Sequence, residues 1–198
     1  MPIKIATICG SVRPGNYTSM ALNLALDELA KYPDVEVTPT YLEHLDLPLP
    51  GLPAKNPDAI EQFQNTVKDS TAVLLASPEY HGGISSPMKL AIDNLGFPSM
   101  LANKPVSLLG VAAGVIGAIK STEQLRAICA HVGAIPLPAV VSVAKVQQIF
   151  DPDGACLDAD MEKLIRSSAT NLIEYVKDTV CAKVSLEEVL RQMGERHE

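Results

Sequence analysis

Short apolar segments alternate with amphipathic ones along most of this chain, and no other feature of the sequence limits its fold as strongly. Five segments have the length and composition of strands: residues 3–9, 35–41, 72–76, 105–111 and 135–141. The segments between them carry apolar residues at helical spacing, which predicts helices over residues 17–31, 58–68, 86–95 and 122–132. Strands that alternate with helices favour a parallel sheet covered by helices on both faces.

Five strands and their intervening helices predict a doubly wound α/β fold of the flavodoxin-like type, with a five-stranded parallel sheet in the order 2-1-3-4-5. Pro136 and Pro138 interrupt the fifth strand, so we expect it at an edge of the sheet. A long helix over residues 158–180 closes a single domain of residues 1–183. Residues 185–188 resemble a capping box that opens a short helix in the tail, residues 184–198.

Charge and composition exclude several classes of function. The net charge is −7 and Lys and Arg form no cluster, so we expect no binding to nucleic acid. No apolar run reaches the roughly 18–20 residues of a membrane span, and the N-terminal residues do not resemble a secretory signal. The cysteines lie far apart without a CxxC pair, which favours reduced thiols over a metal site. We therefore expect a cytoplasmic protein without a bound metal.

The loop after the first strand has the composition of a phosphate site. It leads into a helix, whose N-terminus presents unpaired N–H groups and the positive end of a dipole. The loop supplies hydroxyl, amide and guanidinium groups that can hydrogen-bond to a phosphate, and a glycine lets the backbone approach the ligand closely. The candidate residues are Gly10, Ser11, Arg13, Asn16, Tyr17, Thr18 and Ser19. The alternative is an ordinary turn. Neither GxGxxG nor GxxxxGK[ST] is present, so a terminal monoester phosphate fits better than a dinucleotide or ATP.

The loops after the third and fourth strands suit a flat ring. Carboxyl ends of parallel strands meet at one edge of the sheet, so these loops should converge on the first loop. The candidate residues are Pro78, Glu79, Tyr80, His81 and Gly82 in one loop and Ala113 and Gly114 in the other. Taken singly, Tyr80 fits a packing role, His81 a solvated position, and the Gly114 loop a plain turn.

Three motifs resemble those of the NADPH-dependent FMN reductase family, a flavodoxin-fold group that includes quinone, chromate and azo-dye reductases. Gly10–Arg13 resembles its Gly-Ser-x-Arg phosphate loop, and Ser77–Gly82 resembles its Thr/Ser-Pro-Glu-Tyr-Asn-Gly loop at the flavin ring. Phe150–Gly154 resembles its Phe-Asp-x-x-Gly turn. The resemblance covers about residues 3–180.

The resemblance implies an FMN-dependent NAD(P)H oxidoreductase. NADPH or NADH would reduce bound FMN, which would reduce a small acceptor such as a quinone, a free flavin, an azo compound or a metal oxyanion. The cofactor carries the chemistry, so the residues above are implied to bind it and none to act as a catalyst. A homodimer or homotetramer is also implied.

Some positions depart from the family pattern. His81 stands where Asn is usual, Asn94 where an aromatic residue is common, and Asn16 and Thr18 replace part of the phosphate loop. Two alternatives remain open: a flavodoxin-type electron carrier, which acts on protein partners, and a domain that has kept the fold without the flavin.

Overall fold

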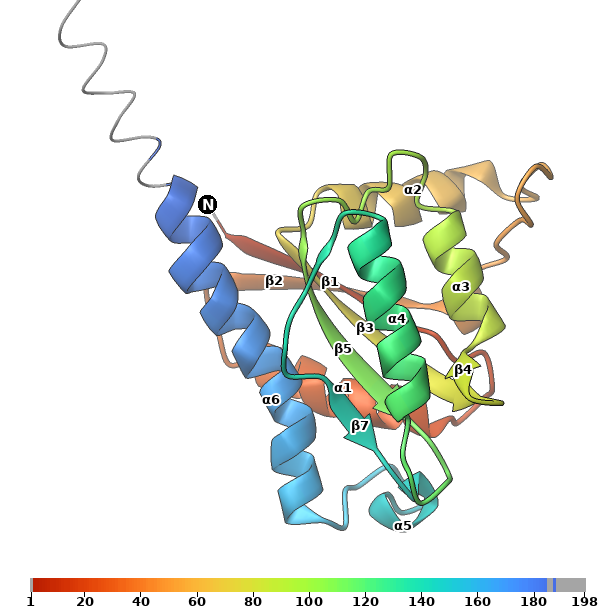
Figure 1. Cartoon of the computed structure of the whole chain (residues 1–198), viewed down its shortest axis with the longest axis vertical. Helices are drawn as coiled ribbons and strands as arrows, with labels where there is room; N and C mark the ends of the chain where they lie inside the picture. Colours follow the sequence, from red (N-terminus) through yellow and green to blue (C-terminus); the bar gives the residue numbers. More distant parts are fainter. Residues whose placement is uncertain (1, 185–186, 188–198) are drawn as a thin grey trace, which may run out of the picture.

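A parallel sheet in the order β2-β1-β3-β5-β6 forms the centre of the computed structural model, which describes residues 2–184 and 187 (Figure 1). Strand β7 also pairs with β5, and β4 adds an antiparallel hairpin to β3. The strands are β1 (Ile3–Cys9), β2 (Val35–Tyr41), β3 (Ala72–Tyr80), β4 (Gly83–Ile84), β5 (Pro105–Val111), β6 (Ile135–Pro136) and β7 (Val141–Val143). With β6 and β7 as the fifth predicted strand, the expected order 2-1-3-4-5 is confirmed.

Helices cover both faces of the sheet, as expected. Helices α1 (Tyr17–Leu29) and α6 (Ala159–Tyr175) pack on one face, around a core that includes Leu22 and Leu172. The opposite face is covered by α2 (Pro57–Lys68), α3 (Ser86–Asp93) and α4 (Ile119–His131), with Ile92 and Leu125 in its core (Figure 1). The short elements are η1 (Leu42–His44), α5 (Val146–Ile149) and the π-helical η2 (Val176–Cys181).

The third strand is longer than its composition predicts, and its predicted end at Ala76 is wrong. The strand continues through Pro78, which pairs with Val111 of β5, and ends at Tyr80. Its pairing with β1 stops at Ala76, so Ser77 and Pro78 have a paired strand on one side only, and Glu79 and Tyr80 then pair with β4. Proline is tolerated where a strand has no ladder on one side. Part of the predicted ring loop is therefore rigid strand.

Both edges of the sheet carry prolines. The predicted fifth strand splits into β6 and β7 around residues 137–140, next to Pro136 and Pro138, because proline cannot donate to a ladder. Its edge position is confirmed. The other edge is β2, which contains Pro39 and is only partly buried.

Helix ends differ from prediction by a few residues. Helix α4 begins at Ile119 instead of 122, and α6 ends at Tyr175 before the π-helical turn. The predicted terminal helix lies outside the described residues, apart from positions 184 and 187.

Asn94, where the family commonly has an aromatic residue, has a structural role: its Nδ2 donates to the carbonyl oxygens of Pro48 (3.0 Å) and Leu90 (2.9 Å). These bonds hold the long loop after η1 against α3.

Two of the cysteines are buried, one on each face of the sheet, as their apolar surroundings indicate. Burial raises the pKa of the Cys9 thiol to about 11 and that of the Cys129 thiol to about 12.

Among the described residues there is no group of three or more His, Cys, Asp or Glu placed to hold a metal ion. Within that same part of the chain, no helix has the length and apolarity to span a membrane.

Candidate functional site

The three loops predicted from the sequence meet at the carboxyl edge of the sheet and enclose a hollow of about 400 Å³. Nine of the fourteen predicted binding residues line it: Ser11, Arg13, Asn16, Tyr17, Thr18, Pro78, Glu79, Tyr80 and Ala113. The predicted convergence of these loops is therefore observed in the structure. The other five, Gly10, Ser19, His81, Gly82 and Gly114, lie beside the hollow in structural positions.

The first loop is shaped by its own side chains. Asn16 caps α1: its Oδ1 accepts from the N–H of Ser19 at 2.8 Å, and its Nδ2 donates to the Arg13 carbonyl at 2.7 Å. The Ser19 hydroxyl donates to the Asn16 carbonyl at 2.7 Å. The side chains of Asn16 and Ser19 are thus used to form the loop, and the helix starts where an N-cap asparagine sets it.

What remains free in the first loop suits an anion. The N–H groups of Tyr17 and Thr18 occupy the first two helical positions, which have no acceptor within a helix. Among the residues that the structure describes, the Thr18 hydroxyl makes no hydrogen bond, and the Ser11 hydroxyl only accepts a long one (3.5 Å) from the Arg13 N–H. Gly10 lies beneath them.

Gly10 is needed because its surroundings leave no room for a side chain. A Cβ at this position would lie 2.9 Å from Met88 Cε and 3.1 Å from the carbonyl oxygen of Ala76. The Gly10 carbonyl accepts from the Ser85 hydroxyl at 2.6 Å, and Ser85 also caps α3 by accepting from the Met88 N–H. The Ser85 N–H donates to Ser77 Oγ at 3.3 Å. One buried serine therefore links the first loop, the third strand and α3.

Arg13 and Tyr80 lie together at the mouth of the hollow. The guanidinium carbon of Arg13 lies 5.3 Å from the centroid of the Tyr80 ring, a cation–π contact. The Tyr80 side chain is 37% exposed, so a face of the ring is accessible to a ligand. Together they supply a cation for phosphate and an aromatic surface for a flat ring.

Glu79 lines the hollow but is also a structural residue. Its Oε2 accepts from the N–H of Ser121 at 3.0 Å, in the first turn of α4. Ala118, the N-cap residue of α4, makes no side-chain capping hydrogen bond. The carboxylate of Glu79, which lies in β3, caps the helix instead. The sequence indicated Glu79 as a ring contact and gave no sign of this cap.

His81 and Gly82 form the two-residue turn of the β3–β4 hairpin. Both have positive φ, 51° for His81 and 75° for Gly82, and the hairpin pairs Tyr80 with Gly83. Two positive φ values are what a type I′ hairpin turn requires, and Asn-Gly is its preferred sequence. His81 is exposed and does not line the hollow. The presence of His where the family usually has Asn therefore alters a residue of the turn and not a residue of the hollow.

The third loop contributes less than expected, and the last strand more. Ala113 lines the hollow, whereas the Gly114 carbonyl accepts from the N–H groups of Gly117 (3.3 Å) and Lys145 (3.1 Å). Six further lining residues were missed: Pro14, Gly15, Val111, Ala112, Val146 and Gln147. The last two follow β7, and the rule that ligands bind at carboxyl ends of strands applies to that strand as well.

The Phe150–Gly154 turn, the third motif, supports the first loop without lining the hollow. The Phe150 ring lies 6.5 Å from that of Tyr17, centroid to centroid. The Asp151 Oδ1 accepts from the N–H groups of Asp153 (3.0 Å) and Ala155 (2.8 Å), which closes the turn. This turn therefore packs against the start of α1.

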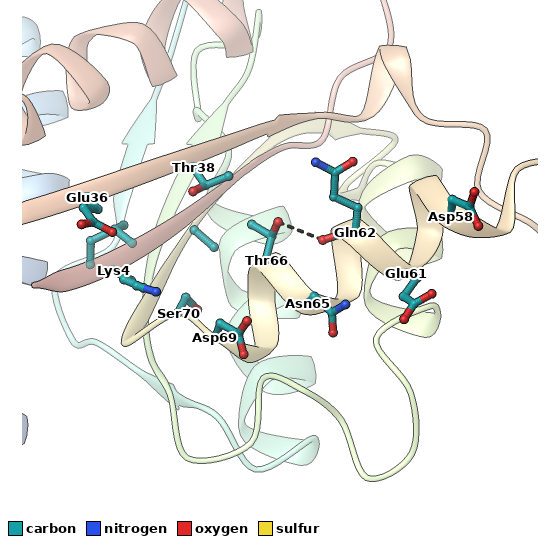
Figure 2. Close-up of a pocket in the computed structure, with 12 residues that line it drawn as sticks. Lys4, Glu36, Thr38, Asp58, Glu61, Gln62, Asn65, Thr66, Asp69 and Ser70 are labelled. Carbon is teal, nitrogen blue, oxygen red and sulfur yellow. Dashed lines mark hydrogen bonds between the residues drawn. The ribbon is translucent and has the colours of Figure 1, made fainter. Parts of the chain in front are cut away.

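A second hollow, of about 510 Å³, lies between α2 and the β1–β2 edge (Figure 2). It is strongly polar, and none of the three loops contributes to it. Its labelled lining residues are Lys4, Glu36, Thr38, Asp58, Glu61, Gln62, Asn65, Thr66, Asp69 and Ser70. The hydrogen bond drawn there, from Thr66 Oγ1 to the Gln62 carbonyl (2.9 Å), stays within α2. We regard it as a solvated groove and assign the candidate site to the carboxyl edge.

The Glu79 cap leads to a stability prediction. We expect Glu79→Ala to lower the free energy of unfolding by about 1–2 kcal/mol, because the N–H of Ser121 loses a charged acceptor. Urea denaturation would measure the change. Glu123→Ala, which removes an exposed carboxylate from the same helix, is the control. Equal losses in the two variants would show that the cap contributes nothing.

The comparisons with known proteins agree with this geometry. The model of the NADPH-dependent FMN reductase family matches residues 3–148. An NAD(P)H-dependent FMN reductase of Pseudomonas aeruginosa is 31% identical, over 88% of this chain and 96% of its own length. An NAD(P)H:quinone oxidoreductase of Solanum tuberosum is 32% identical, over 83% and 88% respectively.

A solved structure of similar fold extends the comparison. The NAD(P)H:acceptor oxidoreductase FerB of Paracoccus denitrificans superposes with a TM-score of 0.71 at 23% identity, over 89% of this chain and 98% of FerB. At that identity the match supports the fold alone. The family match and the two curated relatives go further: this chain belongs to the NADPH-dependent FMN reductase family.

Proposed function

We propose that this chain, an FMN-dependent NAD(P)H oxidoreductase, holds FMN in the hollow at the carboxyl edge and reduces a small quinone-like acceptor. The observation that supports this site most strongly is that the N-terminus of α1, with its unpaired N–H groups, and the partly exposed ring of Tyr80 line the same hollow. Residues 1–183 would form the FMN-binding domain, and small molecules would be its partners.

The residues at the site fit FMN. A phosphate at the start of α1 would meet the N–H groups of Tyr17 and Thr18, the hydroxyls of Ser11 and Thr18, and the guanidinium of Arg13. The anion would replace water at donors that the fold leaves unpaired. The flat end of the cofactor would lie against Tyr80 and the small residues Ala112 and Ala113.

When bound, FMN accepts hydride from the nicotinamide and passes electrons on, and the protein binds and orients it. Buried Val111 and Ala112 give the hollow an apolar floor that limits water beside the ring. Glu79 fixes the end of β3 relative to α4, so the backbone N–H groups near the ring have a defined position. None of these side chains has to take or give a proton in this proposal.

The acceptor is proposed from the relatives, since the hollow itself accepts more than one ring. Their printed names include a quinone oxidoreductase, a 2-hydroxy-1,4-benzoquinone reductase and an azoreductase. A flat aromatic acceptor would stack where the nicotinamide had been, and the exposed face of Tyr80 is suited to such a ring. Electron transfer to a protein partner is the alternative.

The proposed reaction is tested by absorbance. We expect the protein, loaded with FMN and freed of excess, to lose its flavin absorbance when NADPH is added without oxygen, and to regain it with 1,4-benzoquinone. Absorbance that persists with both NADPH and NADH would favour an electron carrier. Failure to retain FMN would refute the proposed site.

Binding variants test the phosphate assignment. We expect Arg13→Ala to raise the Kd for FMN by about tenfold or more, because a charge-assisted hydrogen bond is lost. Thr18→Val, which removes one hydroxyl at nearly constant shape, should have a smaller effect. Quenching of flavin fluorescence would give both constants, with Lys163→Ala on α6 as the control. An unchanged Kd for Arg13→Ala would disprove the assignment.

A homodimer, or a tetramer built from such dimers, is proposed from the surface of α3 and α4, which lie side by side (Figure 1). Two adjoining apolar hollows of about 700 and 860 Å³ share Lys89, Asp93 and Gln124. Phe97 lies on the rim of the larger one with its side chain fully exposed. A protruding ring beside a hollow is self-complementary under twofold symmetry, because each copy can fill the hollow of the other.

Size-exclusion chromatography with light scattering tests this interface. We expect the wild-type chain to elute as a dimer or tetramer and Phe97→Asp to elute as a monomer at the same concentration, because a charge would enter an apolar contact. Leu157→Asp places the same charge on an exposed leucine outside this surface and should leave the mass unchanged. A monomeric wild type would rule the interface out.

We also propose that the protein works in the cytoplasm and binds no nucleic acid. The buried thiols of Cys9 and Cys129 are compatible with a reducing compartment. The net charge of −7 is unfavourable for contact with a phosphate backbone.

A further inference from the structure

Lys120 occupies a defined position at the rim of the candidate site. It lies in the first turn of α4, next to Ser121, whose N–H is bound by Glu79. Its side chain packs over the β3–β4 turn: a Cβ on Gly82 would lie 3.3 Å from Lys120 Cδ and 3.8 Å from its Nζ. The ammonium group is therefore placed by the same hairpin that carries Tyr80 into the hollow.

The charge of Lys120 has no partner within the part of the chain that the structure describes. It forms no ion pair or hydrogen bond there, although the chain carries seven more acidic than basic side chains. Other cations near α4 are already engaged: Lys89 with Asp93 (2.6 Å), and Arg126 with the Pro138 carbonyl (2.9 Å). An exposed ammonium beside a ligand hollow is available to an anion of that ligand.

The chemistry of the electron donor indicates which anion this is. NADPH differs from NADH only by a phosphate on the adenosine ribose, far from the nicotinamide ring. If the nicotinamide enters the hollow, that phosphate must lie outside it, beyond the rim. A group that distinguishes the two donors must therefore lie at the rim, as Lys120 does, and cations accommodate a 2′-phosphate in other dinucleotide sites.

Two other cations near the hollow are less suitable. Arg13 stacks on Tyr80 and is assigned to the phosphate of FMN. Lys145 precedes α5 in a left-handed conformation (φ 47°), at the side of the hollow formed by Val146 and Gln147. Lys120 packs on the β3–β4 turn at Gly82, next to Tyr80, and has no role assigned in FMN binding.

We propose that Lys120 binds the 2′-phosphate of NADPH and gives this enzyme its preference for NADPH over NADH. The proposal rests on the proposed function, since it requires the nicotinamide to enter the FMN site. The pairing is between an exposed ammonium and a phosphate, so it is weakened by salt.

Steady-state kinetics of the FMN-loaded protein test the proposal. We expect the wild type to prefer NADPH, and Lys120→Gln to lower kcat/KM for NADPH about fivefold while leaving that for NADH unchanged. Lys120→Arg should retain the preference. Lys163→Gln, which removes an exposed charge from α6 on the opposite face, is the matched control. A wild type without a preference, or a Lys120→Gln variant that keeps it, would overturn the proposal.

A binding measurement separates this proposal from the proposed function. Calorimetry with adenosine 2′,5′-bisphosphate and with AMP needs no turnover. We expect the FMN-loaded wild type to bind the bisphosphate more tightly than AMP, and Lys120→Gln to bind both alike. If neither nicotinamide nucleotide reduces the flavin, the proposed function fails, and the titration still decides the role of Lys120. Equal affinities for the two probes in the wild type would refute that role.

Discussion

The buried hydroxyl of Ser85 connects the parts of the site that the sheet alone does not join. In a parallel sheet, the loops that follow the strands all start at the carboxyl edge. Beyond that edge, nothing in the sheet itself keeps one loop close to the next. The Ser85 hydroxyl donates to the Gly10 carbonyl and accepts from the N–H of Met88 in the first turn of α3, and the Ser85 N–H donates to Ser77 Oγ. All of these groups are buried, so loss of any one would leave an unpaired polar atom away from water. The first loop and the end of β3 are thereby held in one relative position.

Two of the helix N-termini at this edge, those of α1 and α4, differ in what occupies their first turn. Helix α1 is capped by Asn16 of its own loop, and its first two residues, Tyr17 and Thr18, line the hollow. Helix α4 has its first turn occupied by the Glu79 carboxylate, so that end is already neutralised. The start of α1 therefore keeps its first N–H groups available, while the start of α4 is joined to the end of β3. Glu79 determines by its charge which of two similar helix ends is open.

Strand order, helix faces and the meeting of three loops followed from periodicity and from the geometry of parallel sheets. The failures have local causes. Ser77–Tyr80 has loop composition, yet Ser77 and Pro78 still pair with β5, and Glu79 and Tyr80 pair with β4. Glu79 and Asn94 form their hydrogen bonds with residues 42 and 46 positions away in the sequence, Ser121 and Pro48. A local sequence pattern cannot predict contacts between residues so far apart. Gln147 was missed because the proline-broken fifth strand gave no reason to expect a loop at its end.

The prolines at the two outer strands of the sheet also affect how copies of this protein meet. A row of unpaired N–H and C=O groups on an outer strand is a template on which another chain can add a strand. Here β2 contains Pro39, which has no N–H to donate, and the opposite border consists of two- and three-residue pieces beside Pro136 and Pro138. Neither border offers a continuous ladder, so growth of the sheet from molecule to molecule is blocked at both ends. Helical surfaces such as that of α3 and α4 offer no ladder at all, so a contact made through them would not extend the sheet.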